Sequence, residues 1–274
     1  MAEITQTELW NGEAGARWTA FQERIDRLFA PFDEVLLRRA APTVGESVLE
    51  VGCGCGGSTL ALARAVGEGG SVLGIDLSRP MLQRARERTA GMANVTLRQG
   101  DAGRYVFPDP VTLIYSRFGV MFFDDPALSF RNLRSALGLG GRLCFVCWQA
   151  LELNPWHALP LRAAARLVAL PPPAEPGQPG PFSLAKEEHL QSLLTEAGFE
   201  DVQMHGHTLQ LSLGDLASAT ELMTEVVGPL SRALATLDAF AREAARAEVR
   251  AALREHLAGD QVSLAASVWI VHAR

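Results

Sequence analysis

The chain has 274 residues, 48% of them hydrophobic, and a formal net charge of -6 at pH 7. This length can bury one large core, and we expect a single decorated domain. The negative charge and the lack of a Lys- or Arg-rich run argue against a nucleic-acid partner. No apolar stretch reaches the ~20 residues of a membrane span, and the first ten residues do not resemble a signal peptide, so we expect a cytoplasmic protein with no membrane partner.

Strand-like and helix-like segments alternate through the first half of the chain. A helical arm is expected first, over residues 13–40. Strands are expected near 47–51, 71–75, 94–98, 111–116 and 141–148. Amphipathic stretches lie between them, at 57–67, 79–90 and 126–137, and a glycine marks the end of each. This alternation predicts a doubly wound α/β sheet.

The alternation stops after the fifth strand. The stretches LNPWHALPL and PPPAEPGQPGPF, at 153–161 and 171–182, predict an ordered loop or hinge because their prolines and glycines do not continue a helix or a central strand. Later elements are expected as a helix over 185–197, a strand within 199–213, helices over 214–226 and 230–258, and a last strand over 262–274. The helical piece between the last two strands exceeds what a hairpin loop needs, and we expect it to pack as a cap over one end of the sheet.

Four cysteines form two closely spaced pairs, Cys53 with Cys55 and Cys144 with Cys147. Such spacings occur in metal and disulfide sites. However, the first pair lies in a glycine loop, and the second lies in a strand, where residues three apart face opposite sides. We therefore expect four small apolar side chains in a reducing compartment, and no metal site.

The stretch VLEVGCGCGGSTLALA, residues 48–63, joins a strand to a helix through four glycines in six positions. Bare backbone at this point lets a ligand approach the helix N-terminus, and the match to GxGxxG leaves a dinucleotide site open. Glu50 stands two residues before the loop, where a carboxylate would repel a pyrophosphate but not a zwitterionic or cationic ligand. Charge therefore argues against a phosphate ligand.

Two later strands also end in a carboxylate. Asp76 ends SVLGID, within reach of the ribose hydroxyls of an adenosyl group, and Asp101 follows NVTLRQG, where it could meet an adenine edge. Capping of the following helices is the alternative for both residues, because aspartate is favoured at helix starts. Three successive strand ends thus offer one acidic group each.

Together VLEVGCGCGG, GIDLSRPML, QGDA and LRSALGLGGRLCFV resemble the class I S-adenosylmethionine-dependent methyltransferases, and among them the bacterial small-molecule group related to the quinone C-methyltransferases. The resemblance covers residues 45–150 and extends more weakly into WNGEAGARW and SRFGVMFFDDP. It implies a Rossmann-like seven-stranded sheet with an antiparallel last strand, S-adenosylmethionine as cofactor, and a small-molecule methyl acceptor. Thr112 departs from the aspartate that often begins the fourth strand in this family.

The resemblance also implies a set of cofactor contacts: Trp18, Glu50, Gly52, Cys53, Gly54, Gly56, Asp76, Leu77, Met81, Gly100, Asp101, Ala102, Ser116, Arg117 and Phe118. In this set Asp76 would hold the ribose hydroxyls, and Ser116, Arg117 and Phe118 would lie near the reacting methyl group. A solvent-facing ion pair is the alternative for Arg117. For Trp18, whose ring could attract a sulfonium, the alternative is a buried anchor of the arm. Phe122 and Phe123 are expected in the core.

Methyl transfer needs few catalytic groups from the protein, because the sulfonium is already activated and its leaving group is a neutral thioether. A base is needed only if the acceptor must lose a proton, as a hydroxyl does, and the histidine candidates are His157, His205 and His207. We select His157 and Arg117 as catalytic candidates, with an uninvolved histidine as the alternative. NPWH at 154–157 is similar to a motif of base-modifying methyltransferases, but it follows the wrong strand for that role.

The sequence therefore predicts a methyltransferase that acts on a small, hydrophobic or aromatic molecule. We expect an arm at 1–44, a cofactor-binding core at 45–150 and a substrate-side region at 151–274. The arm, the 150–185 segment and the helical cap would select the acceptor. An NAD-dependent oxidoreductase and a non-catalytic cofactor-binding protein are the alternatives. The acceptor, the atom methylated, the use of a base and the oligomeric state, including a homodimer, stay open.

Overall fold

The computed structural model describes residues 4–169, 178–226 and 228–274. They fall into two compact units. The first unit comprises Met1–Trp148, Pro176–Gly206 and Val268–Arg274, and the second comprises Gln149–Glu175 and His207–Ser267. Among the described residues, no helix combines the length and the apolar character that crossing a bilayer requires.

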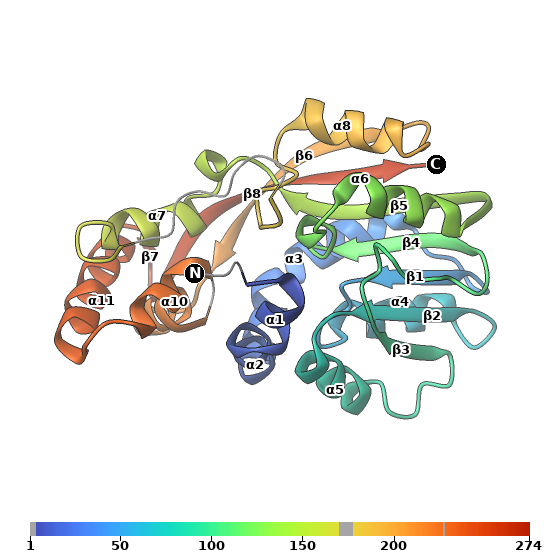
Figure 1. Cartoon of the computed structure of the whole chain (residues 1–274). Coiled ribbons are helices and arrows are strands. Elements are labelled where there is room, and N and C mark those ends of the chain that lie inside the picture. Colours follow the sequence, from blue (N-terminus) through green and yellow to red (C-terminus); the bar gives the residue numbers. More distant parts are fainter. Residues whose placement is uncertain (1–3, 170–177, 227) are drawn as a thin grey trace. The chain divides into compact units, whose positions relative to one another are not determined.

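The strands follow one another across the sheet in the order β3-β2-β1-β4-β5-β8-β6, and a short β7 pairs with β8 (Figure 1). Their bounds are Ser47–Val51 for β1, Ser71–Asp76 for β2, Val95–Gln99 for β3, Val111–Arg117 for β4, Leu137–Trp148 for β5, Gln203–Ser212 for β6, Leu257–Ala258 for β7 and Gln261–Ala273 for β8. The β3-β2-β1-β4-β5 neighbours pair in parallel, whereas β5 and β8 are antiparallel. The doubly wound sheet with an antiparallel last strand is confirmed.

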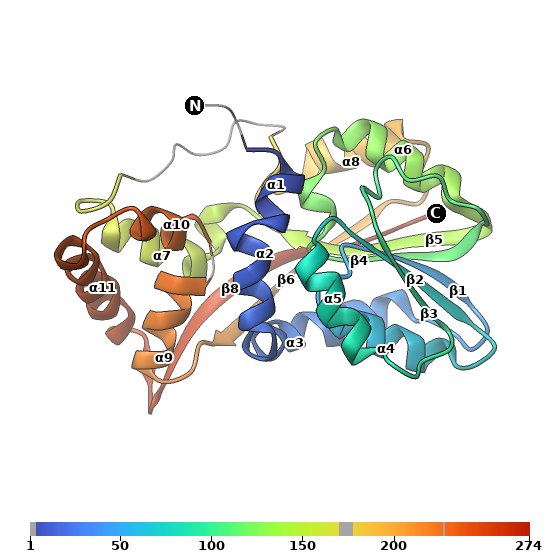
Figure 2. The ribbon, with the colours of Figure 1, turned by 60° about the horizontal axis from the view of Figure 1, so that its bottom comes forward.

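The helices of the first unit cover both faces of the sheet. Their bounds are Gln6–Asn11 for α1, Glu13–Ala20 for α2, Gln22–Ala40 for α3, Gly57–Val66 for α4, Arg79–Arg88 for α5, Pro126–Ala136 for α6 and Glu187–Glu196 for α8. In Figure 2, α3, α4 and α5 lie on one side of the strands, and α6 and α8 lie on the other. The central strands, buried on both faces, carry fully buried apolar side chains such as Leu49, Ile114 and Phe145.

The N-terminal arm is helical, as expected over 13–40, but it is longer and is divided. It begins earlier and consists of three helices, with breaks at Gly12 and Phe21. Thr5 and Glu8 form a capping box that starts α1, and the spacing T-x-x-E in the sequence is the signal that could have located it. The arm therefore begins with a short helix whose N-terminus is capped.

The second unit is mainly helical. Its helices are α7 over Pro155–Ala164, α9 over Leu216–Glu221, a π-helical turn over Leu222–Val226, α10 over Gly228–Ala235 and α11 over Ala239–Arg254. The helix expected over 230–258 is thus interrupted, because the Asp238 side chain accepts a hydrogen bond from the Ala241 N–H and starts a new helix.

The prediction of a loop at LNPWHALPL was wrong, because most of this stretch is helical and belongs to α7. Pro155 takes the first helical position, where a missing N–H costs nothing. The buried Asn154 fixes that start, since its amide donates to Gln149, Ala150 and Ser267 carbonyls and accepts from the Ser267 N–H and the Trp156 indole. Residues 171–177 of the second Pro-rich stretch lie outside the described residues, and 178–182 form bends and turns.

Candidate cofactor-binding site

The glycine loop runs from the end of β1 to the start of α4 and is fastened to the end of β2. The Gly52 and Cys53 N–H groups both donate to the Ile75 carbonyl, at 2.8 and 3.2 Å. Gly52 has φ of 71°, and a Cβ there would lie 2.7 Å from the Cα of Gly119. Only glycine fits this close approach between the loop and the turn after β4. The carboxyl ends of β1, β2 and β4 therefore meet at the loop.

Asp76 lies at the centre of this edge. Its Oδ2 accepts the Gly54 N–H and its Oδ1 accepts the Ser78 N–H, each at 2.8 Å. Burial raises the pKa of this carboxyl, and among the described residues it has no Arg or Lys partner. Ser78, not Asp76, caps α5, so the capping alternative for Asp76 was wrong.

The Asp76 carboxylate fits an adenosyl ribose. Its oxygens accept the Gly54 and Ser78 N–H groups, and the Leu77 backbone also contributes, yet a carboxylate has about four acceptor positions and can still receive an O–H donor of a ribose diol. A pyrophosphate at the same place would meet an unneutralised carboxylate. The donor set thus suits a neutral diol better than a phosphate.

Glu50 connects β1 to the start of α4 through side-chain hydrogen bonds. It has no exposed surface, and its carboxyl accepts hydrogen bonds from the hydroxyls of Ser58 and, at 2.5 Å, Thr59 in the first turn of α4. Burial raises its pKa to about 7. The side chain therefore ties the strand to the helix, and this arrangement does not favour the direct cofactor contact predicted for Glu50.

Cys53 also turns away from the loop surface. Its side chain is buried with Leu82, Ala85 and Leu97 between the loop, α5 and β3. All four cysteines are buried and free. Because the thiol of Cys53 belongs to the core, only the backbone of this residue can take the predicted place beside a cofactor.

Arg117 is held in an ion-pair network whose partners, Asp26 and Asp33, the sequence does not indicate. Its guanidinium is 2.8 Å from Asp33 and 3.9 Å from Asp26, and Asp26 also pairs with Arg88 at 2.8 Å. Burial raises the pKa of Asp33, and the two carboxylates raise that of Arg117 against its own burial. Arg117 thus forms an ion pair, as the alternative expected, but the pair is largely buried rather than solvent-facing. Its guanidinium is already engaged, which gives no support to a catalytic role.

Strain marks the turn after β4. Phe118 has φ of 62°, which is rare for an aromatic residue and costs about 1–3 kcal/mol. Its ring stacks on Trp148 with centroids 4.3 Å apart and planes 10° from parallel. The Ser116 hydroxyl donates to the Val51 carbonyl at 2.8 Å and accepts the Gly119 N–H at 3.1 Å. Such strain is typical of functional turns, and this one adjoins the glycine loop.

The residues predicted around the adenine follow the ends of β2 and β3. Met81 is buried against Gly54, and the Gly100 N–H donates to the Asp76 carbonyl at 3.0 Å. Asp101 accepts the Gly103 N–H at 2.8 Å in a turn, while Ala102 is buried. The structure thus brings these residues to the same edge as Asp76, and their contact with an adenine stays a prediction.

Trp18 belongs to an aromatic cluster of the arm. Its ring meets Trp10 edge-on at 5.7 Å and lies 6.3 Å from Phe29, and Trp10 also meets Phe122 at 5.2 Å. Phe29 continues the cluster to Phe118 at 5.3 Å. The half-buried Trp18 therefore anchors the arm, and its sulfonium contact stays a prediction.

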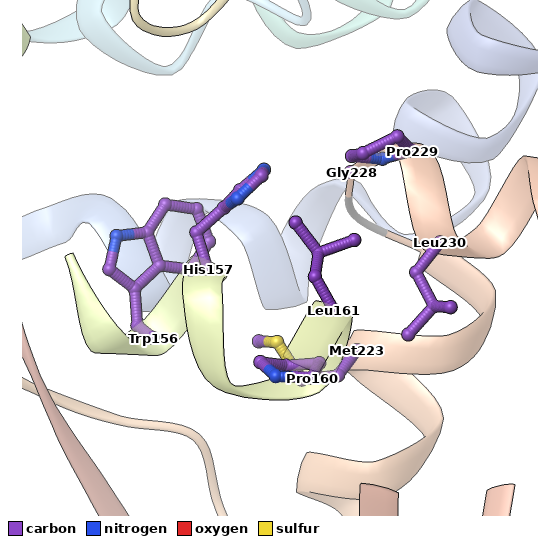
Figure 3. A pocket seen from close by; sticks show the side chains of 8 residues that line it. All are labelled: Trp156, His157, Pro160, Leu161, Met223, Gly228, Pro229 and Leu230. Carbon is purple, nitrogen blue, oxygen red and sulfur yellow. The ribbon is translucent and has the colours of Figure 1, made fainter. Parts of the chain in front are cut away.

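His157 lies in the second unit, whereas the predicted cofactor contacts belong to the first. Figure 3 shows it at a small, largely apolar pocket. The lining residues are Trp156, His157, Pro160, Leu161, Met223, Gly228, Pro229 and Leu230. Burial lowers the pKa of His157 to about 4, so the imidazole is neutral at pH 7 and a weak base.

Residues 48–141 match a family model described as a methyltransferase domain. The chain is 31% identical over 175 residues to the demethylmenaquinone methyltransferase of Staphylococcus aureus, in an alignment that covers 60% of this chain and 72% of that relative.

Two solved structures share the fold. YcgJ of Bacillus subtilis has 16% identity and a TM-score of 0.59, and the match covers 88% of this chain and 96% of that one. Phosphoethanolamine N-methyltransferase 2 of Haemonchus contortus has 18% identity and a TM-score of 0.61, and the match covers 100% of this chain and 60% of that one. At such low identity, these matches support the architecture alone.

Proposed function

This chain belongs to the class I S-adenosylmethionine-dependent methyltransferases, and we propose that it methylates a small, apolar, aromatic molecule. S-adenosylmethionine is its cofactor, so the NAD-dependent alternative was wrong. The main support for the cofactor site is the partly exposed Asp76 carboxylate, which accepts the Gly54 and Ser78 N–H groups and has no cationic partner among the described residues.

Two observations favour an apolar aromatic acceptor. The relative from Staphylococcus aureus is named for a quinone, an apolar ring compound whose reduced form, a hydroquinone, is aromatic. The helices that we propose to select the acceptor line a pocket with apolar side chains and a single neutral imidazole, and this pocket is too small to hold the acceptor itself. Selection of the acceptor by the arm, the 150–185 segment and the helices after β6 also stays a proposal.

The residues of the chain act mainly by orientation. When bound, S-adenosylmethionine supplies a methyl group on a sulfonium whose leaving group is a neutral thioether. The glycine loop and Asp76 would hold the adenosyl and methionine parts, and the Phe118–Trp148 stack would keep water from the turn after β4.

A strong general base is not evident at the candidate histidine. With a pKa of about 4, His157 can accept a hydrogen bond but does not readily take a proton from a hydroxyl at pH 7. This favours an acceptor that is nucleophilic by itself, such as an electron-rich ring.

An acceptor screen with isotope-labelled S-adenosylmethionine and mass detection tests the proposal. Its compounds would be a short-chain reduced naphthoquinone, phenols, catechols, alkylamines and phosphoethanolamine. We expect label on the reduced quinone or the phenols. Label on phosphoethanolamine alone would contradict the acceptor class, and S-adenosylhomocysteine binding without label on any compound would favour the non-catalytic alternative.

Partners and location need separate tests. A homodimer, a cytoplasmic location and the lack of nucleic-acid and membrane partners stay predictions. Sedimentation of the purified chain addresses the first, and cell fractionation addresses the second.

A further inference from the structure

The end of α1 is fastened to the turn that joins β2 to α5. The Asn11 amide nitrogen donates to the Leu77 carbonyl at 2.9 Å and to the Thr7 carbonyl at 2.8 Å. Its oxygen accepts the Arg79 N–H at 3.0 Å. One side chain therefore caps its own helix and binds both ends of a turn 66 to 68 residues further along the chain.

Neighbouring contacts strengthen this attachment. The Ser78 hydroxyl donates to the Trp10 carbonyl at 2.7 Å. Gly15 lies so close that a Cβ there would be 2.6 Å from the Ser78 Oγ. α1 and α2 are thus packed on Ser78 at backbone distance, and Asn11 supplies the specific hydrogen bonds.

The same turn fixes Asp76. The Ser78 N–H donates to the Oδ1 of Asp76 at 2.8 Å, so the place of Ser78 decides where this carboxylate points. Leu77 and Arg79, on either side of Ser78, are the two residues that Asn11 holds. A path of hydrogen bonds therefore leads from α1 to the carboxylate at the strand ends.

We propose that Asn11 is a positioning residue for the adenosyl subsite. It holds the Leu77–Arg79 turn so that Asp76 is presented to the ribose hydroxyls, and the inference rests on that assignment of Asp76. By reciprocity, the cofactor must stabilise the docking of α1 by the same factor by which the docking raises cofactor affinity.

A helix cap alone does not account for Asn11. Capping α1 needs only the bond to Thr7, whereas the bonds to Leu77 and Arg79 reach the next layer of the unit. The Gln99 amide also donates to the Leu77 carbonyl at 3.1 Å, so loss of Asn11 leaves that carbonyl one donor. We therefore expect a moderate effect rather than loss of binding.

The test is titration calorimetry of the full chain with S-adenosylhomocysteine. Asn11→Ala should weaken binding about five- to tenfold, the size expected for two partly exposed hydrogen bonds. Binding of 5′-methylthioadenosine, which has the adenosyl group but no amino acid, should weaken by the same factor. Asn11→Asp keeps the acceptor for the Arg79 N–H but loses the donors. Its affinity for both ligands should lie between those of the wild type and Asn11→Ala.

Asn94→Ala is the matched control. Asn94 donates to the Ala63 and Gly67 carbonyls at 2.8 and 2.9 Å, just before β3 and thus at the opposite end of the strands. It should lower the melting temperature and leave affinity for S-adenosylhomocysteine within twofold. Hydrogen exchange at the Arg79 amide should slow on ligand binding in the wild type and much less in Asn11→Ala.

Two outcomes would overturn the role of Asn11. One is wild-type affinity of Asn11→Ala and Asn11→Asp for both ligands, and the other is an equal loss in Asn94→Ala. If the wild-type chain itself did not bind S-adenosylhomocysteine, the cofactor site would be wrong, which is a different failure. A negative acceptor screen would contradict neither the role of Asn11 nor the cofactor site.

Discussion

The strand ends of the first unit and the pocket of the second are shaped in different ways. At the strand ends, Asp76 is held by backbone N–H groups, and the loop before it is shaped by glycines. The pocket beside His157 is lined by side chains of Trp, Pro, Leu and Met. Backbone geometry thus shapes one region, and side-chain volume shapes the other.

This difference predicts which of the two regions should tolerate amino-acid substitutions. A backbone-defined site fails when one Cβ or one carboxylate changes, because the partner atoms cannot move away. A pocket of apolar side chains can repack, so substitutions there should have smaller effects than substitutions at the strand ends. The following variants test that contrast.

Gly52→Ala should have the largest effect. The new Cβ would lie 2.7 Å from the Gly119 Cα at a φ of 71°, and neither backbone can yield easily. We expect about 3 kcal/mol of destabilisation and more than about 100-fold weaker binding of S-adenosylhomocysteine.

Gly140→Ala is the control for Gly52→Ala, because Gly140 has a similar φ of 73° but no atom within 4 Å of its Cβ position. It should cost about 1–2 kcal/mol and leave affinity unchanged. Equal affinities of the two variants would show that the close approach does not matter for binding.

Asp76→Ala should weaken binding of S-adenosylhomocysteine by about 100-fold, since hydrogen bonds to a charged group contribute about 1.5–3 kcal/mol each. Asp125→Ala is the control, because Asp125 also accepts a backbone N–H, that of Leu128 at 2.9 Å, but caps α6. It should lose about 1 kcal/mol of stability and no affinity. Calorimetry and urea unfolding measure the two quantities.

Glu50→Gln should change how stability depends on pH. The folded-state pKa of Glu50 is about 7, above its usual 4.5, so the folded state binds the extra proton between these values. Wild-type stability should therefore fall as pH rises from 4.5 through 7, by at most about 3 kcal/mol relative to Glu50→Gln.

Glu46→Gln should show the opposite sign. The ion pair with Arg142, at 2.6 Å, helps to lower the pKa of Glu46, so its stabilisation is present above 4.5 and is lost as pH falls through the folded-state value. Urea unfolding at pH 3, pH 5 and pH 8 compares the two variants, because the Glu46 contribution changes below pH 4.5 and the Glu50 contribution changes mainly between pH 5 and pH 8. Parallel pH curves for wild type and Glu50→Gln would contradict the buried carboxyl.

His157→Phe should have the smallest effect. Because the imidazole is neutral and weakly basic, we expect a change of less than about tenfold in KM for an aromatic acceptor and unchanged affinity for S-adenosylhomocysteine. A fall in kcat of about 1000-fold would instead identify His157 as the general base.

The sequence predicts the backbone-defined region well. β1, β2, β4 and the glycine loop follow from apolar runs and glycines, and Asp76 lies where its strand ends. The same reasoning missed Asp26 and Asp33, because their pairing with Arg117 joins α3 to β4 and has no local signal.

The second unit was harder to predict because its prolines were read as breakers. Pro155 instead starts α7, and the fixing contact, the buried Asn154 with Ser267, spans 113 residues. His157 was selected as a base from its position in the chain, yet the burial that lowers its pKa is a property of the folded unit. Long-range packing was the missing information in both cases.

The most direct test of the cofactor site is a thermodynamic cycle between Asp76→Ala and removal of the ribose 2′-hydroxyl from S-adenosylhomocysteine. If Asp76 accepts that hydroxyl, the two changes are coupled by about 1–2 kcal/mol, and the 2′-deoxy ligand loses little further affinity in the variant. Additive losses in calorimetry would contradict the contact on which the proposed site depends.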